Sequence, residues 1–274
     1  MKIGLTADNY SHIPVSIILR MLRWMGVDFS EVTINIFSHP KRALRSSRGM
    51  KLGLHLPNIG NCGFDFSCVE QKDKVESALN TIKRYEELFD FQYTVFHIPE
   101  KDSNHDAFEF YLHNLRQIET PLVLENIIGW SPEQFFGFYR RLKVELGEQI
   151  IGMCLDVPHA YISRSDWKAF FLESNLEVKV IHLSDCNPEE DLHLPFGLCG
   201  SLDLDKILTT LYNLEFNGVI NFEIKPTSLR NLNVFFNSYL QAKAIFQPEG
   251  IGKIQKRMQI ISLIGRIIGL LFRY

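Results

Sequence analysis

The sequence predicts a single (β/α)8 TIM barrel followed by an extra amphipathic helix at the C-terminus. Short apolar segments alternate with segments of helical periodicity through most of the chain, and there are eight of these apolar segments. No linker or shift in composition divides them. Residues 1–247 are therefore expected to form one α/β barrel domain, and residues 251–274 an appended basic helix.

The expected strands are short and apolar, as is typical of strands buried on both faces. They cover residues 2–6, 29–37, 50–56, 92–98, 121–127, 150–157, 178–184 and 218–224. The expected helices cover residues 14–25, 41–48, 70–89, 106–118, 132–146, 166–172, 204–214 and 228–245. Gly26 and Gly147 follow two of the helices, and Ser131 before Pro132 is a favourable helix start.

Composition and charge narrow the class of protein. The chain has 274 residues, of which 46% are hydrophobic and 22% charged, and its net charge is −3. This balance argues against a nucleic-acid partner. Five scattered cysteines without a CxxC pair indicate reduced thiols. The first residues are expected to form a strand and do not show the basic region followed by an apolar region that is typical of a signal peptide. A cytoplasmic protein is therefore expected.

Polar side chains recur at the carboxyl ends of six expected strands. They are His55, His97, Glu125, Asp156, His182 and Glu223. In a barrel these ends converge on one mouth, where active sites are built. A carboxylate or imidazole buried at such a place needs a partner. A core histidine that is simply hydrogen-bonded to its neighbours would explain one such residue but not six. The recurrence on six strands predicts a shared metal site.

Three further residues extend this set. His159 follows Asp156 by three positions, and Asp191 and His193 form an Asp-x-His pair in the loop after the seventh strand. A hydrogen-bonded Asp–His turn and a solvated acidic loop are the simpler explanations. The spacing also lets these side chains reach a metal ion.

The ordered motifs GLHLP, VFHIP, VLENI, CLDVPHAY, IHLSD, DLHLPFG and NFEIKP resemble the xylose-isomerase-like TIM barrels. This superfamily includes sugar isomerases, sugar epimerases and endonuclease IV, and also phosphodiesterases that remodel cobamides. The resemblance covers residues 1–245.

The resemblance implies two alternative chemistries. In the isomerase and epimerase branch, one Mn or Mg ion would be held by Glu125, Asp156, His182 and Glu223, and the two glutamates would act as catalytic acid and base. In the endonuclease IV branch three ions would be bound. The three ligand sets would be His55, His97 and Glu125; Glu125, Asp156, His182 and Glu223; and His159, Asp191 and His193.

Because all nine positions are filled, the sequence favours a metal-dependent hydrolase of a small phosphoester, with a nucleotide-like or cobamide-type substrate. The alternatives are a sugar or sugar-phosphate isomerase or epimerase, and a non-catalytic metal barrel. Leu198 and Cys199 replace a Gly-Glu-Gly run of endonuclease IV, which argues against cleavage of DNA. Five histidines favour one to three ions of Zn, Mn or Fe over Mg. The loop 58–68 is expected to be a lid.

The C-terminal segment 251–274 is expected to be an amphipathic helix. Its expected polar stripe consists of Lys256, Gln259, Ser262, Arg266, Gly269 and Arg273. Arg266 interrupts the apolar run, which is also short for a membrane span. Two alternatives remain open: the helix lies on an anionic inner membrane surface as a peripheral contact, or it packs on the barrel or in a homodimer.

Overall fold

The computed structural model describes residues 1–10, 13–99, 105–173, 177–225 and 232–272. Its eight parallel strands are β1 (Lys2–Leu5), β2 (Phe29–Thr33), β3 (Lys51–His55), β4 (Phe91–His97), β5 (Leu122–Glu125), β6 (Ile150–Asp156), β7 (Val178–Leu183) and β8 (Val219–Phe222). They pair in the order β1-β8-β7-β6-β5-β4-β3-β2, which leaves β1 and β2 at the two edges. A parallel bridge between Ala7 and Val32 joins these edges, so the sheet closes into the predicted barrel.

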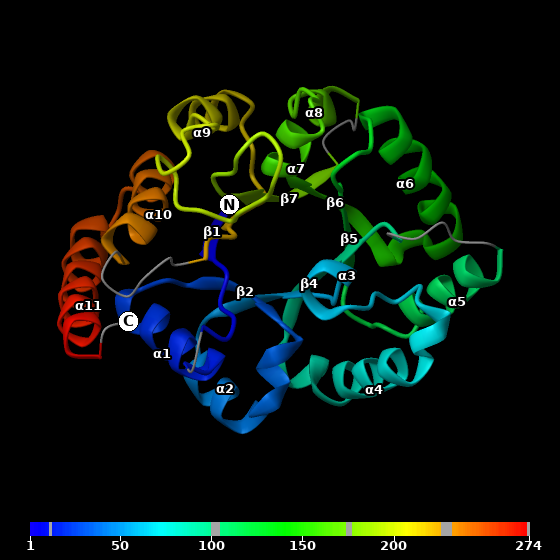
Figure 1. Ribbon diagram of the computed structural model, residues 1–274, viewed down its shortest axis with the longest axis horizontal. Helices are drawn as coiled ribbons and strands as arrows, with labels where there is room; N and C mark the ends of the chain where they lie inside the picture. The colour runs from blue at the N-terminus through cyan, green and yellow to red at the C-terminus, as the bar shows by residue number, and fades with distance from the viewer. Residues whose placement is uncertain (11–12, 100–104, 174–176, 226–231, 273–274) are drawn as a thin grey trace.

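Helices surround the barrel (Figure 1). The main ones are α1 (Val15–Met25), α2 (Pro40–Ser46), α4 (Lys72–Phe89), α5 (His105–Leu115), α6 (Pro132–Leu146), α9 (Leu204–Asn213), α10 (Leu232–Phe246) and α11 (Ile251–Phe272). Shorter helical segments are α3 (Ile59–Cys62), α7 (Val157–Ile162), α8 (Ala169–Glu173) and the 3-10 turns Ile34–Ser38, Val69–Gln71 and Gly147–Gln149. As predicted, Ser131 caps α6 and forms a capping box with Gln134.

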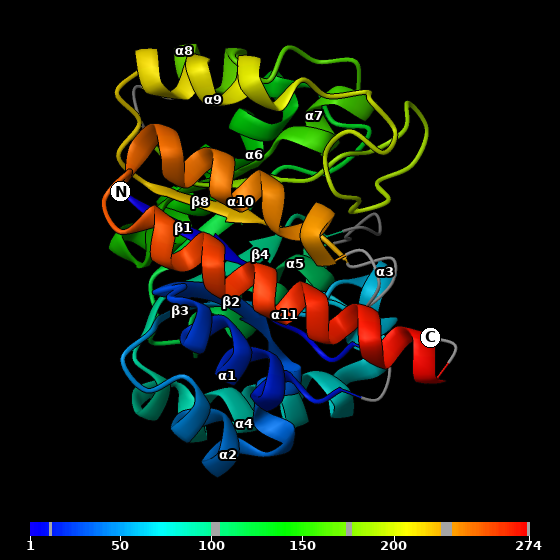
Figure 2. The ribbon, with the colours of Figure 1, turned by 90° about the vertical axis from the view of Figure 1, so that its left-hand side faces the viewer.

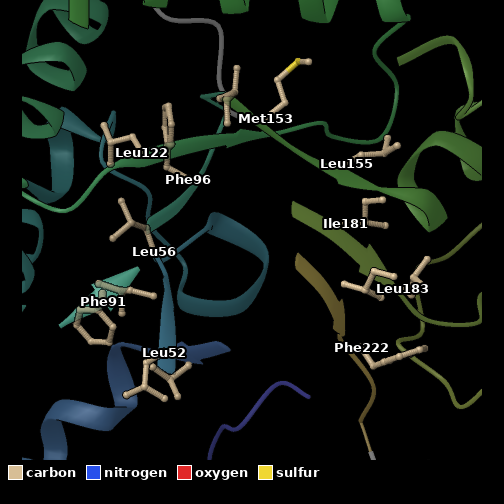
Figure 3. Close-up of a cluster of buried hydrophobic side chains, with 14 of the residues drawn as sticks. Leu52, Leu56, Phe91, Phe96, Leu122, Met153, Leu155, Ile181, Leu183 and Phe222 are labelled. Atoms are coloured by element: carbon tan, nitrogen blue, oxygen red, sulfur yellow. The ribbon is translucent and has the colours of Figure 1, made fainter. Parts of the chain in front are cut away.

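Apolar side chains fill both faces of the sheet. One large cluster lies between the strands and the helices, and Figure 3 shows part of it, including Leu52, Phe96, Leu155 and Phe222. A smaller cluster consists of Phe29, Tyr93, Val95, Val123, Cys154, Val180 and Val219. These seven residues alternate along their strands with members of the large cluster, so they face the barrel interior. Burial on both sides explains why the strands are almost wholly apolar.

Some element limits differ from the sequence prediction. The second strand ends at Thr33 rather than at residue 37, because the Thr33 side chain accepts from Asn35 N–H and starts a 3-10 turn. The short helices α3 and α7 were not predicted. The expected lid 58–68 forms α3 and then turns inward, where Phe64 and Phe66 are buried. Residues 228–231 of the expected last barrel helix lie outside the described residues.

The C-terminal helix α11 packs on the barrel, between α1 and α10 (Figure 2). Met258 is buried in this contact, and Arg257 Nη1 donates to Trp24 O at 2.8 Å. Ser262, a member of the expected polar stripe, is also buried. Among the described residues, no helix is long and apolar enough to cross a membrane. Figure 2 shows that the end of α11 lies on the same side of the molecule as α3, which follows the carboxyl end of β3.

Candidate metal centre

The alternation of strand side chains places the candidate residues inside the barrel mouth. Four of them follow an inward-facing residue by two positions. The pairs are Val95 and His97, Val123 and Glu125, Cys154 and Asp156, and Val180 and His182. The register of the sheet then sets His97 beside Glu125 and Asp156 beside His182 on neighbouring strands. The strands therefore bring together residues that are far apart in the sequence.

All nine predicted residues lie at this mouth and are linked by contacts of 3.1–3.6 Å between imidazole nitrogens and carboxylate oxygens. They fall into an inner and an outer group. Glu125, Asp156, and His182 are at most 1% exposed. The side chains of His159, His193 and Glu223 are 13–15% exposed and form the outer rim. His39 and His113, which were not predicted to belong to the site, are exposed.

Glu125 is the centre of the inner group. Its Oε2 lies 3.2 Å from His55 Nε2, 3.2 Å from His97 Nε2 and 3.5 Å from His182 Nδ1. One carboxylate oxygen has two lone pairs, so it cannot accept well-aligned hydrogen bonds from three imidazoles. In the described part of the chain, the buried atoms His97 Nε2 and His182 Nδ1 have no hydrogen-bond partner of good geometry. Buried nitrogen lone pairs that converge in this way fit a bound cation.

Three of the histidines are held by the ring nitrogen that faces away from the site. His55 Nδ1 contacts Leu56 O at 2.9 Å, His159 Nδ1 contacts Asn126 O at 2.8 Å, and His182 Nε2 contacts Glu31 Oε2 at 3.0 Å. A peptide carbonyl only accepts, so His55 and His159 carry a proton on Nδ1, and on losing their second proton they would present Nε2 to the site as a lone pair. This arrangement is typical of histidines that bind a metal.

Glu31 and Asn126 support the site and were not predicted from the sequence. The buried Glu31 accepts from His182 and from the hydroxyl of Tyr93, at 3.0 Å and 2.9 Å. Gly53 leaves room for the Tyr93 ring, because a Cβ at Gly53 would lie 2.7 Å from it. The Asn126 side chain accepts a hydrogen bond from the Asp156 N–H and donates one to the Asp156 C=O, so it holds the backbone of Asp156 on both sides. A glutamate within the apolar strand FSEVT was the available signal for Glu31.

The side chains form clusters of candidate ligand atoms that lie within 4.8 Å of one another. Clusters among the described residues include His55, His97 and Glu125; Asp156, His182 and Glu223; and Glu125, Asp156 and His159. Mixed nitrogen and oxygen donors of this kind suit Zn, Mn or Fe. His159, Asp191 and His193 do not form such a cluster in the described part of the chain, although Asp191 Oδ2 lies 3.4 Å from His159 Nε2 and 3.3 Å from His193 Nδ1.

The loop that carries Asp191 and His193 is fixed by a buried carboxylate. Asp185 Oδ2 accepts from the backbone N–H groups of Gly197, Cys199 and Gly200 at 2.9–3.1 Å. His193 itself has a left-handed backbone, with φ of 48°. Such a conformation is uncommon for a residue other than glycine and is found mostly where the surroundings require it.

The buried charges shift one another's titration. Burial alone would lower the pKa of His55, but the hydrogen bond and charge of Glu125 outweigh burial and raise that pKa to about 9. Burial also opposes the charge of His159 and His182, but Asp156 beside His159, and Cys154 and Glu31 beside His182, outweigh burial and raise both pKa values well above the usual value. The neighbouring imidazoles hold the pKa of Glu125 well below its ordinary value despite burial. In the metal-free site, the positive charge that balances the carboxylates is therefore carried by protonated histidines.

A (β/α)8 barrel with histidines and carboxylates gathered at its mouth defines a metal-binding TIM barrel. The pattern of the xylose isomerase-like TIM barrel family matches residues 33–239, and the chain belongs to this family. Members of the family include epimerases, isomerases and endonucleases, so the chain is placed among enzymes. A search of curated protein sequences found no match.

Solved structures of similar fold include three with informative titles. A D-tagatose 3-epimerase-like protein is 18% identical, with a TM-score of 0.61 and coverage of 96% of this chain and 99% of that chain. The 3-keto-D-glucoside 4-epimerase of E. coli is 14% identical, with a TM-score of 0.62 and coverage of 89% and 99%. A family 2 AP endonuclease of Brucella melitensis is 12% identical, with a TM-score of 0.60 and coverage of 90% and 98%. At these identities the likeness establishes the fold.

Proposed function

We propose that the protein is a metal-dependent isomerase or epimerase that moves a proton at a carbon beside the carbonyl of a small sugar-like substrate. The observation that carries the proposal is the position of two glutamates around one imidazole nitrogen. His182 Nδ1 lies 3.1 Å from Glu223 Oε2 and 3.5 Å from Glu125 Oε2. Glu125, Asp156, His182 and Glu223 would hold one divalent ion, which when bound would polarise the substrate carbonyl.

Glu125 and Glu223 would then act as the acid–base pair. They come from the ends of β5 and β8, so they approach the mouth from different parts of the barrel wall. One carboxylate would take the proton from the carbon beside the carbonyl, and the other would return a proton. His55 and His97 would position Glu125, since both contact its Oε2 at 3.2 Å.

The comparisons support this assignment over the hydrolase that the sequence favoured. Two of the similar structures described above carry the name of a sugar epimerase, and a further one is titled L-ribulose 3-epimerase. Phosphoester hydrolysis is the second candidate, and a separate observation favours it. The cluster of His55, His97 and Glu125 is a second set of ligand atoms beside the first, as a multinuclear hydrolase would need.

The test is uptake of solvent deuterium by a panel of ketoses, 3-keto-glycosides and their phosphates in D2O, followed by mass spectrometry. The proposal predicts incorporation at the carbon beside the carbonyl for at least one compound. Glu223→Gln should reduce the rate by about a hundredfold or more. Glu190→Gln, on the exposed part of the loop after β7, is the matched control and should have no effect. Hydrolysis of phosphodiesters without deuterium uptake would favour the second candidate.

A further inference from the structure

An apolar cavity of about 760 Å³ adjoins the candidate metal centre. Its body lies between α1, α10 and α11 and is lined by Ile18, Met21, Leu232, Phe235 and Ile261. The volume falls in the range of sites for small organic ligands, which is roughly 300–1,000 Å³. The cavity is therefore large enough for a ligand group, and Glu125, Asp156 and His182 are not among its lining residues.

Polar groups line one end of the cavity, and this end belongs to the metal centre. Glu223, one of the proposed acid–base pair, lines it together with Thr6, Asp8 and Asn35. Asp8 Oδ1 accepts from Thr33 Oγ1 and Asn35 Nδ2, both at 2.8 Å, so this polar end is well ordered. A molecule bound at Glu223 thus has a polar surface on one side and an apolar compartment on the other.

The opposite rim of the cavity reaches the surface between α1 and α11. Ile17 and Ile264 line the cavity and are 53% and 46% exposed. The C-terminal helix therefore supplies part of the wall, through Ile261, Ile264 and Gly265. The sequence left open whether this helix lies on a membrane surface or packs on the barrel or in a homodimer. It packs on the barrel and forms part of the cavity wall.

We propose that the substrate is amphiphilic, with a polar carbonyl-bearing head at the metal centre and an alkyl or aryl group in this cavity. The proposal rests on the function proposed above, which it extends by naming the substrate class. Burial of an apolar substituent would contribute binding free energy at each methylene, and the open rim between α1 and α11 would admit a chain longer than the cavity.

The test measures binding rather than turnover, with n-butyl, n-pentyl and n-hexyl 3-keto-β-D-glucosides titrated into the full chain by calorimetry. The proposal predicts that the dissociation constant falls by roughly threefold to fourfold for each added methylene. Ile264→Trp narrows the cavity and should remove most of this dependence. Leu263→Trp places the same ring on the same helix at a residue that is 59% exposed and does not line the cavity, so it should leave the dependence intact.

Circular dichroism on both variants checks that they fold. Affinity that does not change with chain length would overturn the proposal, as would equal weakening by the two tryptophan variants. Self-association that competes with hexyl 3-keto-β-D-glucoside in sedimentation experiments would assign this face to a second copy of the chain and would also overturn it. If chain-length dependence is found but no deuterium enters any substrate, the apolar site stands and the proposed reaction fails.

Discussion

Glu31 Oε2 lies 3.0 Å from Nε2 of His182, and neither side chain is exposed. Glu31 belongs to β2 and His182 to β7, so the contact crosses the barrel interior. It fixes the imidazole so that Nδ1 faces Glu125 and Glu223. Glu31 is thus a positioning residue that acts through His182.

Glu31→Gln should lower metal affinity by roughly tenfold to a hundredfold, because an amide is a weaker acceptor for His182 than a carboxylate. Tyr93→Phe removes one of the two hydrogen bonds to Glu31 and should have a smaller effect in the same direction. Competition with a fluorescent chelator measures both. Exposed Glu148→Gln is the control. Unchanged affinity in Glu31→Gln would contradict a positioning role.

Asp185→Ala should loosen the loop that carries Asp191 and His193. The substitution leaves several backbone N–H groups without their charged acceptor, and the free energy of unfolding should fall by about 3 kcal/mol. Asp203→Ala, which removes only the cap of α9, should cost about 1 kcal/mol. Urea denaturation compares the two. Equal losses would show that the loop does not depend on Asp185.

Metal binding should release protons. The pKa of His55 is raised to about 9, and the pKa values of His159 and His182 are raised well above their ordinary value. Near neutral pH these imidazoles are protonated in the metal-free protein, and a ligand must lose its proton. Metal affinity should therefore rise with pH up to about 9. Calorimetry in buffers of different protonation enthalpy counts the protons. Uptake without release would contradict ligation by these histidines.

The stability of the metal-free protein should change with pH in the opposite sense. The pKa of His55 is higher in the folded protein than the ordinary histidine value of 6.5, so its contribution to stability is complete below that value and is lost as the pH rises through about 9. The melting temperature of metal-free protein should fall over this interval. A His55→Gln variant should lose part of this slope. A melting temperature that rises with pH would contradict the assignment.

His193→Asn separates the two candidate reactions. Asparagine tolerates the left-handed backbone at this position, so the variant keeps the loop geometry. If one ion is held by Glu125, Asp156, His182 and Glu223, proton exchange should fall less than tenfold, by roughly a factor of a few. His182→Asn should abolish it. A severe effect of His193→Asn on phosphodiester hydrolysis would instead favour the hydrolase.

The sequence was sufficient to predict the barrel and the gathering of the nine candidate residues at its mouth, because strand periodicity repeats along the chain and the ends of parallel strands converge. Their role as ligands stays a prediction. It could not identify Glu31, whose role depends on a contact with His182 across 151 positions of sequence. The face of α11 that packs was likewise not predictable, since the periodicity of a helix does not say which neighbour buries Ser262. The cavity beside Glu223 depends on that packing.

The central claim is that one divalent ion at Glu125, Asp156, His182 and Glu223 serves the proposed proton transfer. Metal content per folded chain, measured by mass spectrometry after dialysis against trace metal, tests it most directly. The account predicts one tightly held ion, which is lost in Asp156→Asn and retained in His193→Asn. Nearly three ions per chain, with loss of one in His193→Asn, would contradict it.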